Sequence, residues 1–248
     1  MPLTLATTTP GEPEIFASLQ GEGPSAGKPV AFIRLSRCNL ACQWCDTAYT
    51  WHFTGDNRPH RSGATYDRAA NQVTLTEQDA AERIAALGKP RLVITGGEPL
   101  LQGAALARML ETLAELAPEM TVEVETNGTV APHPAFDARI AQYNVSPKLA
   151  HSGNPADLAL PPDRLAHWAA EPRAMFKFVI AQPADVEEVL VLAELHAIPA
   201  ARIWLMAEGT DPQTLASREG WLADMCLQHN LTLSKRLHIE LYGDTRGT

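Results

Sequence analysis

The stretch Cys38-Asn-Leu-Ala-Cys42-Gln-Trp-Cys45 places three of the chain's four cysteines within eight residues. A structural zinc ion is normally held by four protein ligands, so three thiolates leave such a site incomplete. A cubane iron–sulfur cluster held by three cysteines would instead keep one iron open, and an open metal position is where chemistry takes place. Two other interpretations stand beside this one: a zinc knuckle completed by His52, and buried thiols that bind no metal.

The composition favours a single catalytic domain spanning residues 1–248. Hydrophobic residues make up 45% of the 248, enough for one sizeable α/β domain. No apolar run approaches the ~20 residues of a membrane span, and residues 1–10 lack the pattern of a signal peptide. Because free thiols suit a reducing compartment, we expect a cytoplasmic protein. A formal charge of −9 argues against a large nucleic-acid surface and favours a small-molecule substrate.

Short apolar runs alternate with helical stretches along the whole chain. Strands are expected at residues 30–35, 91–95, 121–125, 142–146, 175–180, 202–205 and 236–241. Helices are expected near residues 76–87, 103–117, 162–170, 184–196 and 213–229. Thr76 and Asp79 offer a capping signal for the first helix, and Asp211-Pro212 offers one for the last. Strands alternating with helices predict βαβ units on a parallel sheet, whose reacting groups gather at the carboxyl ends of the strands.

Two stretches and one thiol stand apart from this pattern. Residues 52–75 are too polar for a core, which predicts a long loop or small insertion beside the cysteines. Residues 150–162 contain several Pro, Gly and Asn residues and are expected to form a loop after the fourth strand. Cys226 shares the apolar face of the last helix with Leu222 and Met225, which favours an inert buried thiol.

Two motifs occur along this chain in the order that is typical of one enzyme superfamily. The cysteine run follows the apolar stretch 30–35, and the aromatic Trp44 precedes its third cysteine. About fifty residues on, Leu92-Val-Ile-Thr-Gly-Gly-Glu-Pro99 has the pattern of a strand running into a turn. Together these motifs resemble the signature of the radical S-adenosylmethionine (SAM) enzymes.

Three further stretches narrow the resemblance to one family. They are Phe16-Ala-Ser-Leu-Gln-Gly-Glu-Gly-Pro24, Cys45-Asp-Thr47 and Glu125-Thr-Asn-Gly-Thr129. With them, the chain closely resembles the 7-carboxy-7-deazaguanine synthases from Gln20 to Asp244. The resemblance implies an incomplete TIM-like barrel of parallel strands with outer helices, assembled as a homodimer. It also implies conversion of 6-carboxy-5,6,7,8-tetrahydropterin to 7-carboxy-7-deazaguanine with loss of ammonia, in 7-deazapurine (queuosine) biosynthesis. SAM would be used catalytically, and an external electron donor such as flavodoxin or ferredoxin would supply the electron.

The resemblance assigns cofactors to particular residues. Cys38, Cys42 and Cys45 would hold a [4Fe–4S] cluster, and Thr47 would be the protein ligand of Mg²⁺, an ion that often binds through few protein oxygens. SAM would lie against Gly97, where only glycine lets the backbone approach closely. The remaining SAM-binding candidates are Trp44, Cys45, Asp46, Ser146, Pro147 and Lys148.

The same resemblance places the pterin substrate. Leu19, Gln20 and Gly21 match the family's substrate loop, and a Gln amide offers both a donor and an acceptor to a pterin edge. Arg34, a charged residue inside an apolar strand, suits the substrate carboxylate through its two-pronged guanidinium. Thr95 matches a further substrate contact. His238 is a weaker candidate for the pterin, and no substrate contact is transferred to residues 241–248. Glu125 and Asn127 are weaker candidates that could contact the ribose of SAM.

Alternatives remain at the level of the whole chain and of single residues. Another radical SAM enzyme, such as a glycyl-radical activating enzyme, would keep the cysteines but would not need Thr47. A non-catalytic metal-binding module would need a fourth ligand and would have no use for the Gly-Gly-Glu-Pro turn. Thr47 could simply cap a turn, residues 146–148 could be an ordinary strand-to-loop turn, and Glu125 and Asn127 could satisfy loop backbone.

Overall fold

The fold is built on one curved sheet of eleven strands, in a computed structural model that describes residues 2–248. The strand order is β11-β10-β9-β8-β7-β6-β4-β1-β2, with β3 beside β4 and β5 beside β1. The strands are β1 (Leu3–Thr9), β2 (Glu12–Pro13), β3 (Ile15–Leu19), β4 (Pro29–Leu35), β5 (Gln72–Leu75), β6 (Arg91–Gly96), β7 (Thr121–Thr126), β8 (Gln142–Val145), β9 (Ala174–Ile180), β10 (Ile203–Ala207) and β11 (Thr232–Ser234).

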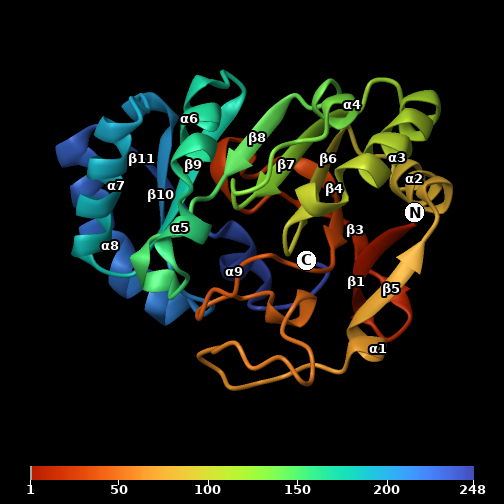
Figure 1. The fold of residues 1–248 in the computed structure, drawn as a ribbon, viewed down its shortest axis with the longest axis horizontal. Helices are drawn as coiled ribbons and strands as arrows, with labels where there is room; N and C mark the ends of the chain where they lie inside the picture. The colour runs from red at the N-terminus through yellow and green to blue at the C-terminus, as the bar shows by residue number, and fades with distance from the viewer. Residues whose placement is uncertain (1) are drawn as a thin grey trace.

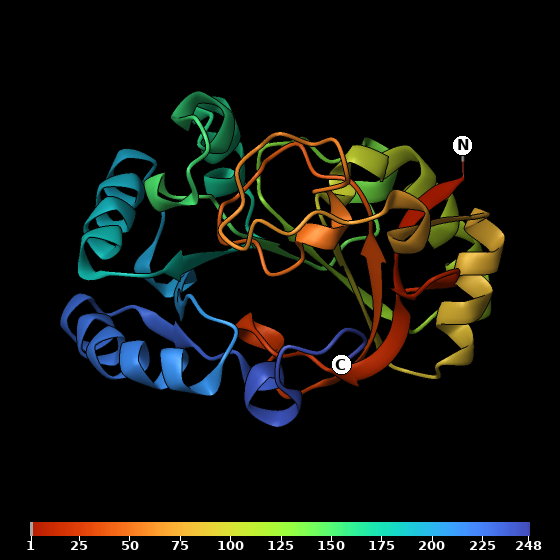
Figure 2. The same cartoon turned by 90° about the horizontal axis from the view of Figure 1, so that it is seen from below.

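Most helices cover the outer face of the curved sheet, whereas α9 lies at the gap of the open barrel and the loop before α1 crosses one of its openings (Figures 1 and 2). The α-helices are α1 (Arg68–Asn71), α2 (Glu77–Ala86), α3 (Gly103–Leu116), α4 (Pro134–Asp137), α5 (Ala156–Ala159), α6 (Pro162–Ala170), α7 (Pro183–Leu195), α8 (Pro212–His229) and α9 (Leu237–Tyr242). Short 3₁₀ turns are η1 (Gly23–Ser25), η2 (Ala48–Thr50), η3 (Pro99–Gln102), η4 (Ala150–Ser152) and η5 (Ala200–Arg202). No helix in residues 2–248 is both long and apolar enough to cross a membrane.

The predicted α/β architecture, an incomplete TIM-like barrel, is confirmed. The strands from β4 to β11, apart from β5, pair in parallel, and helices connect most of them. The order ends at β11 on one side and β2 on the other, so the barrel is not closed. The carboxyl ends of the parallel strands therefore share one rim, where β4 delivers the cysteine run and β6 the Gly-Gly-Glu-Pro turn.

The helix signals read from the sequence begin the helices as expected. The Thr76 hydroxyl accepts a hydrogen bond from the Asp79 backbone N–H at 3.0 Å, at the start of α2. An Asp211 carboxylate oxygen accepts one from the Thr214 N–H at 2.8 Å, at the start of α8. Each bond satisfies a backbone donor that the first turn of a helix leaves unpaired. Cys226 is buried on the inner face of α8, as the pattern indicated.

The predicted strand at residues 236–241 is wrong, because this segment forms helix α9. The last strand, β11, ends at Ser234 and already occupies the sheet edge beside β10. Alternation of Leu237, Ile239 and Leu241 suggested a strand, but Leu237 and Leu241 are also one helical turn apart. Only Ile239 of the three is fully buried, and the Leu237 backbone N–H bonds to the Gly21 carbonyl rather than to a strand.

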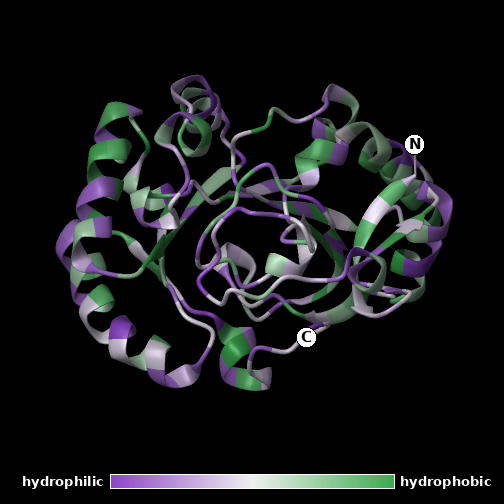
Figure 3. Cartoon of the chain, turned by 60° about the horizontal axis from the view of Figure 1, so that its bottom comes forward, coloured by the Kyte–Doolittle hydropathy of each residue, from purple (hydrophilic) through white to green (hydrophobic). Residues whose placement is uncertain are grey.

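Two stretches expected to be loops contain regular structure. Residues 68–75 of the polar stretch form α1 and β5, and β5 pairs with β1. Strands β1, β2 and β3 were not predicted, since these antiparallel strands lie outside the βαβ pattern, and the short strand β11 was missed as well. Residues 150–162 contain η4 and α5. Residues 51–67 form the loop across one opening of the barrel, where Figure 3 shows mostly hydrophilic ribbon.

Candidate active site

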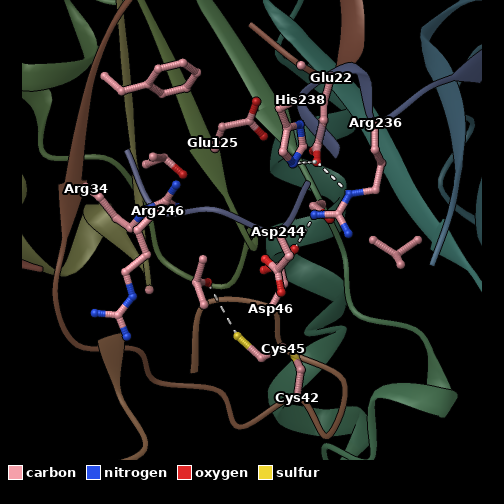
Figure 4. Close-up of a pocket in the computed structure, with 18 of the residues that line it drawn as sticks. Glu22, Arg34, Cys42, Cys45, Asp46, Glu125, Arg236, His238, Asp244 and Arg246 are labelled. Atoms are coloured by element: carbon pink, nitrogen blue, oxygen red, sulfur yellow. Dashed lines mark hydrogen bonds and ion pairs between the residues drawn. The ribbon is translucent and has the colours of Figure 1, made fainter. Parts of the chain in front are cut away.

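A cavity of about 240 Å³ opens at the carboxyl ends of the parallel strands. Every residue assigned to the site from the sequence lines it except Pro147. These lining residues are Leu19, Gln20, Gly21, Arg34, Cys38, Cys42, Trp44, Cys45, Asp46, Thr47, Thr95, Gly97, Glu125, Asn127, Ser146, Lys148 and His238. In Figure 4, Arg34 lies on one wall, Glu22, His238 and Arg236 on the opposite wall, and Cys42 and Cys45 at the lower edge.

The cysteine loop leaves the end of β4 with all three sulfurs as free thiols. Burial raises the pKa of Cys38 to about 12 and that of Cys45 to about 11. Each of two sulfurs receives a side-chain N–H: Asn154 Nδ2 lies 3.3 Å from the Cys42 sulfur, and Trp51 Nε1 lies 3.3 Å from the Cys45 sulfur. The raised pKa values keep these thiols protonated until a metal binds, because metal binding releases the thiol proton. The chain therefore gathers three thiols at one cavity wall and directs a side-chain N–H donor to two of the sulfurs.

The Gly-Gly-Glu-Pro turn packs directly under the cysteine loop. The Gly97 and Glu98 backbone N–H groups donate to the carbonyls of Leu35 and Arg37, at 3.0 and 2.9 Å. A Cβ on Gly97 would lie 2.9 Å from Cys38 Cβ and closer still to the Arg37 carbonyl. Gly97 was expected to let SAM approach closely. The packing of the turn against the cysteine loop already requires glycine at this position.

Glu98 joins the ends of β6 and β7. Its carboxylate accepts hydrogen bonds from the Asn127 and Leu100 backbone N–H groups, at 2.7 and 2.9 Å, and from the Thr126 hydroxyl. Burial nevertheless dominates and raises the Glu98 pKa to about 7. The residue is fully buried and does not line the cavity, so its role is to hold the turn in place.

Arg34 reaches the cavity from β4 with one nitrogen already paired. Its Nε donates to Glu14 at 2.7 Å, and Tyr49 donates to the same carboxylate. Within residues 2–248, Nη1 and Nη2 have no hydrogen-bond partner. Burial opposes the charge, but Glu14 outweighs it and raises the Arg34 pKa above its usual value. Glu14, not foreseen from the sequence, balances the charge of the guanidinium and leaves its fork toward the cavity.

A chain of ion pairs crosses the floor of the cavity. Lys177, from β9, pairs with Glu22 and lies 2.7 Å from Glu125. Arg236 pairs with Glu22 at 3.2 Å and with Asp46 beside the last cysteine. Burial works to raise the Glu22 pKa, but the charges of Lys177 and Arg236 hold it well below its usual range. Burial raises the pKa of Glu125, although Lys177 opposes that shift.

The substrate-loop residues Gln20 and Gly21 are held in place by hydrogen bonds and by close packing against His238. Gln20 is buried and donates to Glu123 and Glu125, each at 3.2 Å. A Cβ on Gly21 would clash with the His238 ring, whose Cγ would be 2.8 Å away. His238 therefore reaches the cavity from α9, not from a strand, and burial lowers its pKa. Thr95 stands beside Arg34 in the β4–β6 register.

The wall around Trp44 contains an unpaired donor. The Trp44 indole N–H is buried and has no partner within residues 2–248, while its ring stacks on His151 at 5.4 Å. The Lys148 ammonium lies 5.6 Å over the same ring and donates to the Ser146 hydroxyl at 2.8 Å. A buried donor without an acceptor is costly, so this wall is suited to a ligand that supplies one.

Several residues that line the cavity were not predicted from the sequence. They are chiefly Glu14, Glu22, Lys177 and Arg236, with Asp244, Arg246 and Thr248 from the tail. One signal was present: Lys177 is a lone charge inside an apolar strand, as Arg34 is. The tail carries no comparable signal, and its place at the cavity depends on the Arg246 guanidinium, which stacks 3.5 Å from the Tyr49 ring centroid.

Comparisons with known proteins agree with this geometry. The model of the radical SAM superfamily matches residues 32–146. The 7-carboxy-7-deazaguanine synthase of Pyrobaculum aerophilum is 37% identical over 94% of this chain and 95% of its own length. That of Hyperthermus butylicus is 35% identical, over 91% of this chain and 90% of its own. The chain belongs to the 7-carboxy-7-deazaguanine synthase family.

A solved structure gives the same family relationship. The crystal structure of QueE from Escherichia coli is similar with a TM-score of 0.63 and 25% identity, covering 95% of both chains. The chain is thus a radical SAM enzyme that uses a [4Fe–4S] cluster and SAM.

The residues at the rim fit both cofactors of the synthase family. Within residues 2–248, no three His, Cys, Asp or Glu side chains are grouped around a point that would hold one metal ion. A four-iron cluster does not need such a point, because each cysteine binds a different iron. The three free thiols at one wall of the cavity and the unpaired Trp44 N–H therefore suit a cluster with SAM beside it.

Proposed function

We propose that this enzyme converts 6-carboxy-5,6,7,8-tetrahydropterin to 7-carboxy-7-deazaguanine, with loss of ammonia and catalytic use of SAM, in 7-deazapurine biosynthesis. The observation that carries the proposal is the cavity itself. One wall holds three cysteine thiols, and another presents an arginine fork whose charge is already balanced by Glu14. The length match to the family's synthases supports the same activity.

The residues of the chain bind, orient and shield in this proposal. When bound, the cluster and SAM supply the one-electron chemistry that removes a hydrogen atom from the substrate. Arg34 binds the substrate carboxylate through Nη1 and Nη2. Leu19, Gln20, Gly21 and Thr95 line the pterin site, and His238 closes it from α9. SAM lies against Asp46, Gly97 and the Ser146–Lys148 segment. Glu125 and Asn127 lie at the rim of the cavity, between the SAM and pterin sites.

The assembly and setting of the enzyme complete the proposal. We infer one domain over residues 1–248, paired as a homodimer in the cytoplasm, with an external electron donor such as flavodoxin or ferredoxin. The family resemblance supports the homodimer.

The test is an anaerobic assay of reconstituted protein with the carboxylated tetrahydropterin, SAM and a reductant. We expect a brown protein, formation of the carboxylated deazaguanine, and no net consumption of SAM. Cys38→Ala, Cys42→Ala and Cys45→Ala should each lose the cluster, whereas Cys226→Ala, the buried control on α8, should keep it. A protein with a full cluster that cleaves SAM without forming this product would contradict the proposed substrate.

A magnesium ion at Thr47 belongs to the same proposal. Thr47 precedes η2, yet its side chain makes no capping hydrogen bond, and its hydroxyl lies 3.6 Å from the Cys45 sulfur at the cavity wall. The capping role considered from the sequence therefore does not occupy the hydroxyl. A neutral hydroxyl binds Mg²⁺ weakly on its own, so the substrate would supply further oxygens.

Thr47→Ala should lower turnover and remove the response to added Mg²⁺, without changing the cluster spectrum or SAM binding. Thr47→Ser keeps the hydroxyl and should retain most of the response. Initial rates at several Mg²⁺ concentrations, after removal of divalent ions by chelation, provide the measurement. A wild-type rate that does not depend on divalent ions would rule the ion out.

A further inference from the structure

The cysteine sulfurs receive hydrogen bonds from residues outside the cysteine motif. Trp51 Nε1 donates to the Cys45 sulfur and Asn154 Nδ2 to the Cys42 sulfur, both at 3.3 Å. The side-chain donor to Cys38 is longer: Asn127 Nδ2 lies 3.9 Å from its sulfur and also donates to Asn39 at 3.0 Å. The Cys45 and Cys42 sulfurs therefore receive the two shortest side-chain N–H hydrogen bonds of the motif.

The position of Trp51 is determined by the polar loop that follows it. The indole is only 4% exposed, and its N–H has no acceptor other than the Cys45 sulfur within residues 2–248. The Arg58 guanidinium covers the ring at 4.7 Å from its centroid. The His60 Nε2 lies 2.9 Å from the Cys45 carbonyl, so the same loop also holds the cysteine backbone. The polar stretch after the cysteine motif therefore positions both the Trp51 ring and the Cys45 backbone.

The orientation of the Asn154 amide is determined by its other bonds. Its Oδ1 accepts from the Ala41 backbone N–H at 2.8 Å, inside the cysteine loop. Its Nδ2 also donates to the Ser152 hydroxyl at 3.1 Å. With the oxygen held by a donor, the amide must direct its N–H groups toward Ser152 and the Cys42 sulfur.

We propose that Trp51 and Asn154 set the reduction potential of the cluster by donating hydrogen bonds to two of its ligand sulfurs. The inference relies on the cluster of the proposed function, but not on the identity of the substrate. Reduction adds one negative charge, which spreads onto the ligand sulfurs. A donated N–H stabilises that charge more in the reduced state than in the oxidised state, so it raises the potential. Both donors are positioning residues, because neither binds iron.

The experiment is an anaerobic redox titration of the reconstituted enzyme, with the reduced cluster measured by electron paramagnetic resonance. Trp51→Phe keeps the ring and removes the N–H, and Asn154→Leu removes the amide. We expect four irons per chain in both variants. At any given potential, the ratio of reduced to oxidised cluster should be roughly threefold to tenfold lower in each than in the wild type. The double variant should show about the product of the two effects.

The chain supplies a matched control in Trp204 on β10. Its indole N–H is buried without a partner and does not line the cavity, so Trp204→Phe removes an N–H that no sulfur accepts. This variant should titrate as the wild type does. Unchanged potentials in loaded Trp51→Phe and Asn154→Leu protein would overturn the proposal. Failure of both variants to bind iron would also overturn it, since the residues would then serve cluster assembly. If the potentials shift as expected in the variants but the wild-type enzyme forms no product from the carboxylated tetrahydropterin, this proposal holds and the proposed substrate is wrong.

Discussion

Arg34 uses one of its three guanidinium nitrogens inside the protein and leaves the other two at the cavity. Arg34→Lys would keep the charge, but an ammonium group cannot bond Glu14 and hold a carboxylate in a fork at the same time. We expect substrate binding at least tenfold weaker, with an unchanged cluster spectrum, measured as KM and by equilibrium binding.

Arg83→Lys is the matched control, because Arg83 makes an exposed ion pair with Glu12 away from the cavity. It should leave substrate binding unchanged. Unaltered affinity in Arg34→Lys would assign Arg34 to the structural pair with Glu14 alone.

Glu98 makes stability depend on pH in a direction unusual for a carboxylate. The unfolded chain loses this proton near pH 4.5, whereas the folded protein keeps it until about pH 7. Between these values the folded state binds more protons, so its stability falls as pH rises, by up to about 3 kcal/mol from this group. Glu98→Gln cannot ionise and should lack this contribution. Urea unfolding at pH 5.5 and pH 8 should therefore show a stability difference between wild type and variant that favours the variant more at pH 8. A difference independent of pH would contradict the raised pKa.

At the scale of elements, α9 packs against the substrate loop with no room for a methyl group at Gly21. Gly21→Ala should push the His238 ring and the helix away, at a cost of about 1–3 kcal/mol in the free energy of unfolding. The loss should be smaller in a His238→Ala background, because the clashing ring atoms are gone.

Gly220→Ala gives the opposite expectation within α8. A Cβ there meets nothing within 4 Å, and replacing a helical glycine should stabilise by about 0.5–1 kcal/mol. Urea unfolding of the wild type, the two single variants Gly21→Ala and His238→Ala, their double variant and Gly220→Ala measures both effects. Equal costs of Gly21→Ala with and without His238 would show that the contact does not limit this packing.

At the scale of the whole molecule, Lys177 connects segments that only the curvature of the sheet brings together. Lys177→Met would leave Glu22 and Glu125 buried with one cation fewer, which should cost about 3 kcal/mol in the free energy of unfolding. Adding Glu125→Gln should recover part of that loss, because one negative charge is removed with the positive one.

Lys235→Met tests the same change at the surface. Lys235 is half exposed and pairs with Glu240, so its removal should cost less than about 1 kcal/mol. Denaturant unfolding of all four proteins is the measurement. Equal losses at Lys177 and Lys235 would mean that the buried network does not contribute as described.

The sequence by itself determined the chemistry of this protein and most of its parallel sheet. The cysteine spacing, the Gly-Gly-Glu-Pro turn and the strand-helix alternation are local patterns. Local patterns can be recognised from the sequence without the structure. They predicted β4 and β6 to β10 and placed the candidate residues at one rim. The strand predicted for residues 236–241 was wrong, because six residues with alternating Leu and Ile are compatible with both a strand and a helical turn.

Only the tertiary structure decided which charges meet across the cavity. Lys177 and Glu22 are 155 residues apart, and Arg236 and Glu22 are 214 apart. Asn154 reaches the Cys42 sulfur across 112 residues. Such contacts depend on strand order, on the curvature of the sheet and on the packing of α9 against the substrate loop. No short window of sequence contains both partners, so their pairing is settled by the packing of the whole chain.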